Sequence, residues 1–521
     1  MDRIEKLFPR YDEAGKELIL RAYNIAAEAL KEQKRSNGNP FIEHPVAVAK
    51  IACDEIGLSA ECIAAVFLHE ATRFFPETEI PKGSFGQDVM TMVDGLNKIS
   101  TINPKDTRLE AENYKKLIVS YSKDPRVTVL KIADRLEVMR SLDMFPEKKR
   151  RDKSWESLNL YAQIAHKLGL YSIKSELEDL SLKYLEPEAY NHIVHELKES
   201  EAERMAFIES FLAPVRALLD RDGINYHIKS RTKSVFSIFQ KMRKQRVDFH
   251  GVYDIFALRI IIDCPVEREK AQCWTVYSHV TSLYTPNPER MRDWISIPKS
   301  NGYESLHTTV SAGGGKWVEV QIRTERMDEV AERGLAAHWR YKGVKGESGL
   351  DEWLTSIRET LENAGSDLEV MDQFKLELYE DEVFVFTPKG DLFKLPKGST
   401  VLDFAFSIHT KLGSKCIGAK VNGKNVQLRQ QLNSGDQVEI MTSNTQTPKQ
   451  DWLSIVTTSK ARTKIRQALK EIEARQTEFA KETIERKFKN RKLEYDDSVM
   501  MRLIKKMGYK TVTLFYQDIA I

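Results

Sequence analysis

The spacing of apolar residues changes along this chain of 521 residues, and the change separates parts of different fold class. From residue 1 to about 195, apolar residues recur every three or four positions, as in “ELILRAYNIAAEAL” and “AECIAAVFLHE”. This period predicts amphipathic helices. Between about 222 and 340, “GVYDIFALRIII” and “WVEVQIRT” show the dense β-branched and alternating patterns of strands. The sequence therefore predicts an all-helical part followed by an α/β part.

The remaining third predicts a small β-rich module and a basic helical segment. “GVKGESG” is typical of a linker, and residues 381–443 predict a hairpin through “PKGD”, a helix starting at Thr400 or Asp403, and a second hairpin at Asn422-Gly423. These elements favour a β-grasp fold. We expect a helical domain at 1–195, an α/β domain at 196–345, a linker helix at 346–380, a β-grasp domain at 381–445 and a helical region at 446–521.

Charge and cysteine usage narrow the class of protein. The net charge of +3 is nearly balanced, so nucleic-acid contacts would have to come from local basic patches. The five cysteines are scattered without metal-ligand spacing, which suits a reducing compartment. No run of 18 apolar residues occurs, and the first residues lack the apolar stretch of a signal peptide. We expect a cytoplasmic protein with no membrane partner.

One segment of the α/β part is suited to phosphate binding. “RTKSVFSIFQKM” places Arg231, Lys233 and Lys241 around the start of a predicted helix that also carries Ser237. A helix N-terminus flanked by cations is a natural phosphate site. The alternative is a basic helix face in solvent.

Two carboxylates lie on predicted strands. Asp254 stands at the mouth of the buried strand, where it could hold Mg²⁺ carrying a triphosphate, or simply cap the strand or pair with an arginine. The alternation of “WVEVQIRT” puts Glu319 and Gln321 on one face, with Glu319 a candidate general base or metal ligand near Asp254.

A third segment combines cations with aromatic rings. “RMRDWISIPKSNGYESLHTTV” contains Lys299, Asn301, Tyr303 and His307, with Trp294 upstream. Cations with an exposed ring suit a nucleotide, because the cations hold phosphates while the ring stacks on a base. A core strand with a polar loop is the alternative.

The helical part contains the outline of a metal-dependent phosphohydrolase. In “VFLHEATRFFPETEI”, His69 and Glu70 are followed one turn later by Arg73 and Phe74. Positions 69 and 73, and likewise 70 and 74, share a helix face. One turn after His69 and Glu70, where further catalytic carboxylates could stand, the chain therefore has a cation and a phenyl ring.

Taken together, these motifs resemble the RelA/SpoT homologues, the long bacterial enzymes that make and break the alarmone (p)ppGpp. “RTKSVFSIFQKM”, “YDIFALRI”, “PKSNGYESLHTTV” and “VEVQIRT” are similar to the family's synthetase signatures, and 381–443 is similar to its TGS domain. The resemblance implies an HD-type helical domain and a nucleotidyltransferase-like mixed sheet. It also implies transfer of the β,γ-diphosphate of ATP to the 3′-hydroxyl of GDP or GTP, in the stringent response.

The resemblance also assigns roles to individual residues. It places Arg231, Lys233, Ser237 and Lys241 on the ATP side. It makes Asp254 a Mg²⁺ ligand, with Glu319 beside it to assist deprotonation of the 3′-oxygen. It places Lys299, Asn301, His307 and Gln321 around the acceptor nucleotide, with Tyr303 stacking on guanine. Phosphoryl-type transfer needs positioning and charge neutralisation, which such a set supplies.

In the HD-type domain the resemblance implies a Mn²⁺ site held by two histidines and two aspartates. Arg35, His44, His69 and Asp134 match this pattern, and Glu70 stands in for an aspartate. Arg73 and Phe74 replace the water-positioning pair, and Val138 replaces a functional asparagine. We expect an inactive, regulatory hydrolase domain without Mn²⁺. The alternatives are a bifunctional enzyme in which Glu70 still ligates, and histidines that are merely packed and hydrogen-bonded.

The C-terminal part raises the question of a ribosomal partner. His409, in “FSIHTKLG”, matches the histidine that contacts the 3′ end of uncharged tRNA in ribosome-associated members. The alternative is a capping or buried histidine. A non-enzymatic tRNA or ribosome sensor is a further alternative for the whole chain. Long members of the family continue with a zinc-finger-like and an ACT-like domain, so the resemblance suggests a longer architecture.

Overall fold

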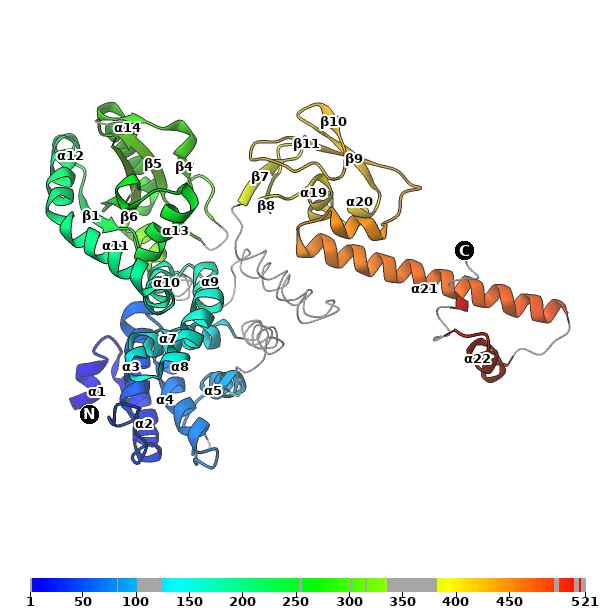
Figure 1. Ribbon diagram of the computed structural model, residues 1–521, viewed down its shortest axis with the longest axis horizontal. Helices are drawn as coiled ribbons and strands as arrows, with labels where there is room; N and C mark the ends of the chain where they lie inside the picture. Colours follow the sequence, from blue (N-terminus) through cyan, green and yellow to red (C-terminus); the bar gives the residue numbers. More distant parts are fainter. Residues whose placement is uncertain are drawn as a thin grey trace. The chain divides into compact units, whose positions relative to one another are not determined.

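The computed structural model describes residues 2–81, 83–100, 124–252, 255–299, 302–313, 316–334, 382–491, 496–509 and 515–516. The chain divides into two compact units, Met1–Leu354 and Thr355–Ile521, which are described separately below (Figure 1). No helix in these ranges combines the length and the apolar composition that a membrane span requires.

The first part of unit 1 is helical, as the 3.6-residue period predicts. Its central helix is α4, in which every side chain from Cys62 to Ala71 is buried, so this helix is apolar on all sides rather than amphipathic. The elements are α1 (Asp2–Leu7), α2 (Glu13–Ala29), α3 (Glu43–Lys50), the π-helix η1 (Ile51–Ile56), α4 (Ala60–Phe74), α5 (Gln87–Ser100), α7 (Pro125–Arg140), η2 (Leu142–Met144), α8 (Glu147–Glu156), the π-helix η3 (Ser157–Tyr161), α9 (Ala162–Lys167), α10 (Tyr171–Leu185), α11 (Pro187–Glu199) and α12 (Glu201–Arg221).

The second part of unit 1 is built on a mixed sheet, which confirms the predicted α/β class. The strands lie in the order β1-β2-β6-β5-β3, with β4 also paired to β5. Strand β2 runs parallel to β6, and the other pairings are antiparallel. The elements are β1 (Tyr226–Thr232), α13 (Val235–Gln245), η4 (Phe249–Gly251), β2 (Phe256–Ile262), η5 (Val266–Arg268), α14 (Glu269–Leu283), β3 (Thr285–Pro286), η6 (Pro288–Arg290), β4 (Arg292–Asp293), β5 (Leu306–Ser311), β6 (Trp317–Thr324) and α15 (Glu325–Arg333).

The two faces of this sheet have different chemistry. One face packs against α12 and α14 through a core that includes Leu258, Val276, Val320 and Val215. Because side chains alternate along a strand, the intervening residues face the other way. That opposite face carries a row of polar side chains on adjacent strands, and it is the face on which the candidate site lies.

The helical part and the sheet part share a small apolar core. Leu182 of α10 and Ile193 of α11 pack with Val235 and Ile238 of α13 and with Phe249 of η4. Helix α10 therefore contacts the helix that follows the first strand of the sheet.

Unit 2 begins, among its described residues, with a small β-rich module and ends with helices. Strands β7 and β8 form the predicted hairpin, while β10, β9 and β11 form a three-stranded antiparallel sheet. Asn422 and Gly423 both have positive φ, as the turn between β9 and β10 requires. The elements are β7 (Glu382–Phe386), β8 (Leu392–Pro396), α19 (Val401–Ile408), α20 (Thr410–Ser414), β9 (Cys416–Val421), β10 (Lys424–Val426), β11 (Val438–Thr442), η7 (Gln450–Ser454), α21 (Ser459–Asn490) and α22 (Asp497–Lys506). The linker helix expected at 346–380 lies outside the described residues.

A buried carboxylate ties the module to the long helix. Thr400 and Asp403 form a capping box at the start of α19. Asp403 is 1% exposed and also accepts hydrogen bonds from the backbone N–H groups of Thr457 and Thr458, at 3.1 and 2.8 Å. One side chain thus fixes both the start of α19 and the approach to α21.

Candidate functional site

The polar face of the sheet brings the predicted residues of three strands together. In the sheet register, Glu319 of β6 lies opposite Thr309 of β5, and Gln321 lies opposite His307. On the other side of β6, Glu319 lies opposite Ala257 of β2, with which Arg231 of β1 is paired. Adjacent strands therefore place the candidate ATP-side and acceptor-side residues on either side of Glu319.

Glu319 is the centre of a hydrogen-bonded network. Lys233 Nζ donates to Glu319 Oε2 at 2.8 Å, and the Gln321 side-chain amide donates to Glu319 Oε1 at 2.8 Å. His307 Nδ1 lies 3.6 Å from Glu319 Oε1. Burial opposes ionisation of Glu319, but the charge of Lys233 outweighs it and lowers the pKa of Glu319 below its usual value. The side chain is thus an ionised carboxylate beside a resident cation.

On the acceptor side, aromatic rings and cations surround Tyr303. The Tyr303 hydroxyl and His307 Nε2 are 2.8 Å apart, and the ring of Trp294 lies edge-on to both. Lys299 Nζ lies 4.2 Å from the centroid of the Trp294 ring. Burial lowers the pKa of His307 to about 3, so its imidazole is neutral at pH 7.

The expectation that Tyr303 is an exposed ring is wrong for this structure. The side chain is 8% exposed, because rings of Tyr171, Trp294 and His307 pack around it. Stacking on a base would require some of these rings to move aside.

On the ATP side, helix α13 begins at Val235, shortly after Arg231 and Lys233 as the sequence predicts, but N–H groups of its first turn already have partners. Ser234 caps α13 by accepting from the N–H of Ser237, and the two hydroxyls are 2.8 Å apart. Asp179 of α10 accepts from the N–H of Phe236 at 2.8 Å. These amides are therefore already hydrogen-bonded within the protein, and phosphate contacts would come from side chains instead.

The side chains that could bind phosphate include cations with other cations nearby. Burial and the nearby Arg259 guanidinium lower the pKa of Arg231. Lys241 lies one turn after Ser237 on α13, so the two share a helix face. Asp254 and Asn301 lie outside the described residues, so their predicted roles stay predictions.

Two arginines of the polar face received no role from the sequence. Arg259 donates to Gln321 Oε1 at 3.2 Å and pairs with Glu332 of α15. The Arg323 side chain is fully buried, with its Cζ 5.9 Å from the centroid of the Tyr303 ring. Strand alternation already put Arg323 on the face of Glu319, which was the signal that could have found it.

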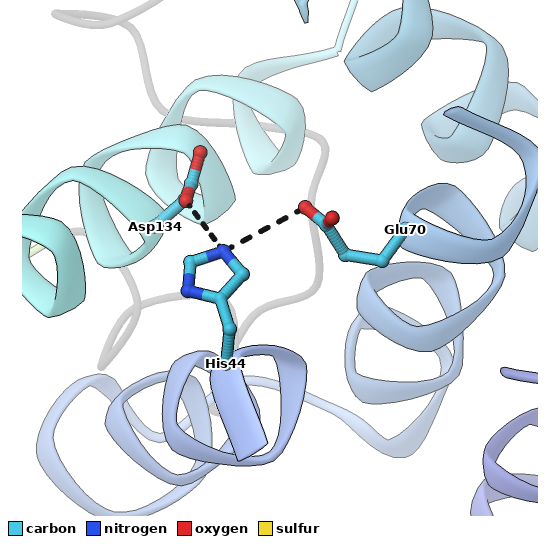
Figure 2. A group of neighbouring side chains, drawn as sticks. All are labelled: His44, Glu70 and Asp134. Carbon is cyan, nitrogen blue, oxygen red and sulfur yellow. Dashed lines mark ion pairs between the residues drawn. The ribbon is translucent and has the colours of Figure 1, made fainter. Parts of the chain in front are cut away.

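A second cluster lies in the helical part and contains the candidate hydrolase residues. His44 of α3, Glu70 of α4 and Asp134 of α7 point toward one another, and their ligand atoms lie within 4.8 Å (Figure 2). His44 Nε2 lies 3.2 Å from Asp134 Oδ1 and 3.7 Å from Glu70 Oε1. These are residue types that bind divalent transition metals.

Each carboxylate of this cluster already has a cationic partner. Arg73 donates to Glu70 Oε2 at 2.6 Å, and Lys131 forms an ion pair with Asp134. Burial disfavours a charged His44, but hydrogen bonds to Asp134 and Glu137 outweigh it and raise its pKa to about 10. Arg73 and Lys131 thus neutralise these carboxylates through Oε2 and Oδ2, while Glu70 Oε1 and Asp134 Oδ1 face His44 Nε2 and remain arranged as a metal site could be.

The other predicted residues of this site have structural partners. Arg35 pairs with Glu137 at 2.7 Å and donates to Ser141 at 2.9 Å. His69 Nδ1 lies 2.8 Å from Asn97 Oδ1, and burial lowers the pKa of His69. Val138, on α7, offers no polar group. Glu137 was not predicted, although its place one turn after Asp134 could have suggested it.

His409, in unit 2, is an exposed capping residue. Its Nδ1 accepts from the N–H of Lys411 at 3.1 Å, at the start of α20. The sequence left open whether His409 caps a helix or is buried. The structure shows the helix cap, and the prediction of a buried histidine is wrong. The ring remains accessible to a partner.

Comparison with protein families matches three parts of the chain. The family described as “Region found in RelA / SpoT proteins” matches residues 230–346, an HD domain matches 22–171, and a TGS domain matches 383–442. The chain belongs to the RelA/SpoT family.

Curated relatives carry names for both directions of alarmone chemistry. A guanosine-3′,5′-bis(diphosphate) 3′-pyrophosphohydrolase of Aquifex aeolicus is 44% identical over 90% of this chain and 67% of its own length. The bifunctional (p)ppGpp synthase/hydrolase SpoT of Escherichia coli is 39% identical over 87% and 65%. A GTP pyrophosphokinase of Myxococcus xanthus is 37% identical over 92% and 64%. This chain spans about two thirds of the length of these relatives.

Proposed function

We propose that this protein is a (p)ppGpp synthetase that transfers the β,γ-diphosphate of ATP to the 3′-hydroxyl of GDP or GTP. The observation that carries the proposal is the continuous contact from Lys233 through Glu319 to His307 and Tyr303. A carboxylate with a cation on one side and a group of aromatic rings on the other suits attack of a hydroxyl on a phosphate. A tRNA or ribosome sensor without catalysis would not need this arrangement.

The proposed roles follow from the contacts. Arg231 and Lys233, with Ser237 and Lys241 on the next helix, bind the ATP phosphates. Glu319, held ionised by Lys233, accepts the proton of the 3′-hydroxyl. Mg²⁺ at Glu319 and Asp254 would neutralise charge on the triphosphate, and an ionised carboxylate is the hard oxygen ligand that this ion prefers.

On the acceptor side we propose that Gln321 and His307 orient the ribose. Lys299 and Asn301 hold the acceptor phosphates, and Tyr303 stacks on guanine once its neighbouring rings have moved. A neutral His307 donates one hydrogen bond from one ring nitrogen and accepts one at the other, which suits a hydroxyl partner.

The test is incubation of the protein with ATP, GDP and Mg²⁺, followed by chromatography of the 3′-diphosphate product. We expect synthesis by the wild type and a loss of about 10³-fold in Glu319→Gln, which keeps the shape but removes the base. Glu176→Gln, on the exposed side of α10, is the matched control. Equal rates for wild type and Glu319→Gln would contradict the proposal.

We further propose that the HD-type domain does not hydrolyse (p)ppGpp. The supporting observations are the Arg73–Glu70 pair of 2.6 Å and the absence of a carboxylate at either position 73 or position 74. The competing candidate is a bifunctional enzyme, favoured by the clustering of His44, Glu70 and Asp134 within 4.8 Å. Incubation with Mn²⁺ and ppGpp decides between them, because clear release of pyrophosphate would establish the bifunctional enzyme.

For unit 2 we propose contact with uncharged tRNA on the ribosome. The exposed ring of His409 and the cations at the start of α21, Lys460 and Arg462, support this proposal. His409→Ala should weaken stimulation of synthesis by ribosomes carrying uncharged tRNA, and should leave unstimulated synthesis unchanged.

A further inference from the structure

Helix α10 of the helical part makes contacts with both halves of the proposed synthetase site. Near its middle, Asp179 accepts a hydrogen bond from the N–H of Phe236 at 2.8 Å, at the start of α13. At its first residue, the ring of Tyr171 packs against Tyr303, with centroids 5.6 Å apart and planes at 79°. The step of eight positions from Tyr171 to Asp179 spans about 12 Å along the helix axis.

We propose that α10 is a working part of the synthetase site: Asp179 positions the ATP-side helix α13, and Tyr171 positions the acceptor-side ring of Tyr303. The proposal rests on the synthetase function argued above and adds two positioning residues to it. Neither residue is expected to touch the reacting atoms.

The argument for Asp179 begins with the donor it satisfies. The first N–H groups of a helix have no partner within the helix, and a side chain that accepts from them fixes where the helix starts. Ser234 accepts from the N–H of Ser237, and Asp179 accepts from the N–H of Phe236, the residue before it. Lys233 immediately precedes this start, and Ser237 lies within the first turn.

The contact is also anchored by packing. Leu182 of α10 lies with Val235 and Ile238 of α13 in one apolar core, so the hydrogen bond and the hydrophobic contact act on the same pair of helices. Loss of the Asp179 acceptor would therefore loosen the start of α13 without separating the helices.

The argument for Tyr171 concerns the setting of the Tyr303 ring. Three rings contact Tyr303 edge-on, and Trp294 and His307 come from the sheet part itself. Tyr171 is the ring that the helical part contributes. Edge-to-face contacts have a preferred geometry, so the Tyr171 ring restricts the orientations open to Tyr303.

Substitution of Asp179 and of Tyr171 should change different Michaelis constants, the KM for ATP and the KM for GDP. A general loss of stability would not separate the two. Asp179→Ala should raise the KM for ATP about tenfold, the size expected from loss of a helix cap, and change the KM for GDP by less than about twofold. Tyr171→Ala should raise the KM for GDP about fivefold, the size of one aromatic pair, with the KM for ATP unchanged.

Conservative variants separate positioning from bulk effects. Asp179→Asn keeps an oxygen acceptor and should retain a KM for ATP close to wild type; Tyr171→Phe keeps the ring and should retain the KM for GDP. Glu176→Gln is the control on the same helix, because Glu176 pairs with Arg140 away from the sheet. Parallel changes in both KM values, a fall in kcat alone, or a lower KM for ATP in Asp179→Ala would each overturn the proposal.

Binding measurements keep this test apart from the proposed function. The dissociation constants of a non-hydrolysable ATP analogue and of GDP are measured by calorimetry on the same full-length variants. A wild type that makes no product, with the two affinities still responding separately, would contradict the synthetase function and support the α10 proposal. If the wild type makes product but no variant changes either dissociation constant, the synthetase function is supported and the α10 proposal is contradicted.

Discussion

Replacement of Arg73 by methionine tests whether a protein cation keeps metal out of the hydrolase-like cluster. Arg73 Nη2 lies 2.6 Å from Glu70 Oε2, and Glu70 is 3% exposed. Methionine keeps much of the apolar stem and the helix propensity but removes the charge. The nearest remaining partners of Glu70 are His44 Nε2 at 3.7 Å and His69 Nε2 at 3.6 Å.

The size of the effect follows from the geometry of the pair. A hydrogen bond to a charged group contributes about 1.5–3 kcal/mol, and solvent weakens this one because the Arg73 side chain is 36% exposed. We therefore expect Arg73→Met to lower the free energy of unfolding by about 2 kcal/mol in metal-free buffer. A metal ion that uses Glu70 no longer has to displace the guanidinium, so the Mn²⁺ dissociation constant should fall about 30-fold.

Mn²⁺ is titrated into the protein in a calorimeter, which gives the dissociation constant. Thermal unfolding is measured with and without Mn²⁺. Both are done in a Glu319→Gln background, which weakens ion binding at the synthetase site. Arg140→Met is the matched control, since Arg140 pairs with Glu55 and Glu176 instead. If wild type and Arg73→Met bind Mn²⁺ with dissociation constants within about twofold, the reasoning about Arg73 is wrong.

Three further predictions concern other parts of the chain. Lys233→Met removes the cation 2.8 Å from Glu319 and should raise the KM for ATP by about tenfold to a hundredfold in steady-state assays, with the KM for GDP unchanged. Asp403→Asn should speed amide hydrogen exchange at 400–408 and 457–465 by about 30-fold, because the single oxygen of an asparagine side chain cannot accept from both the Thr400 N–H and the Thr458 N–H. Burial and the nearby Arg135 lower the pKa of Lys153 to about 8, whereas Lys153 in the unfolded chain keeps its ordinary pKa of 10.5. Between these two pH values the unfolded state binds more protons, so the free energy of unfolding should rise with pH. In denaturant at neutral pH, Lys153→Met should therefore have a free energy of unfolding about 3 kcal/mol higher than wild type, and this difference should shrink toward pH 10.

The fold class could be predicted from the sequence where one period dominates a segment. The alternation of “WVEVQIRT” placed Glu319 and Gln321 on one face, and the structure has them there, opposite Thr309 and His307. Asn422-Gly423 likewise predicted its hairpin, because few residues tolerate two successive positive φ values. The burial of α4 on all sides was not predictable, since helical spacing does not say how many neighbours will cover a helix.

Less of the candidate synthetase site could be predicted from the sequence, because its contacts join segments that are far apart in the chain. Nothing local to “RTKSVFSIFQKM” indicates that Asp179, more than fifty residues earlier, accepts from an N–H at the start of α13. The exposure of Tyr303 was predicted wrongly for the same reason: Tyr171 belongs to another part of the chain. Glu70 and Arg73, by contrast, are three residues apart on one helix, and side chains at this spacing are neighbours, so the sequence alone can indicate the contact that the structure contains.

Hydrolysis and the positioning of α13 would depend on different helices of the helical part. This separation explains how hydrolysis could be lost while the domain is kept. The hydrolase-like cluster lies on α3, α4 and α7, and its carboxylates are neutralised locally by Arg73 and Lys131. The contacts to α13 come instead from α10 and α11. Because changes at sites without shared partners act nearly independently, replacement of the water-activating residues need not disturb the contact to α13. Removal of the whole domain would also remove α10, and with it the acceptor for an N–H at the start of the ATP-side helix. The helical part is therefore expected to be required for synthesis even in a protein that hydrolyses nothing.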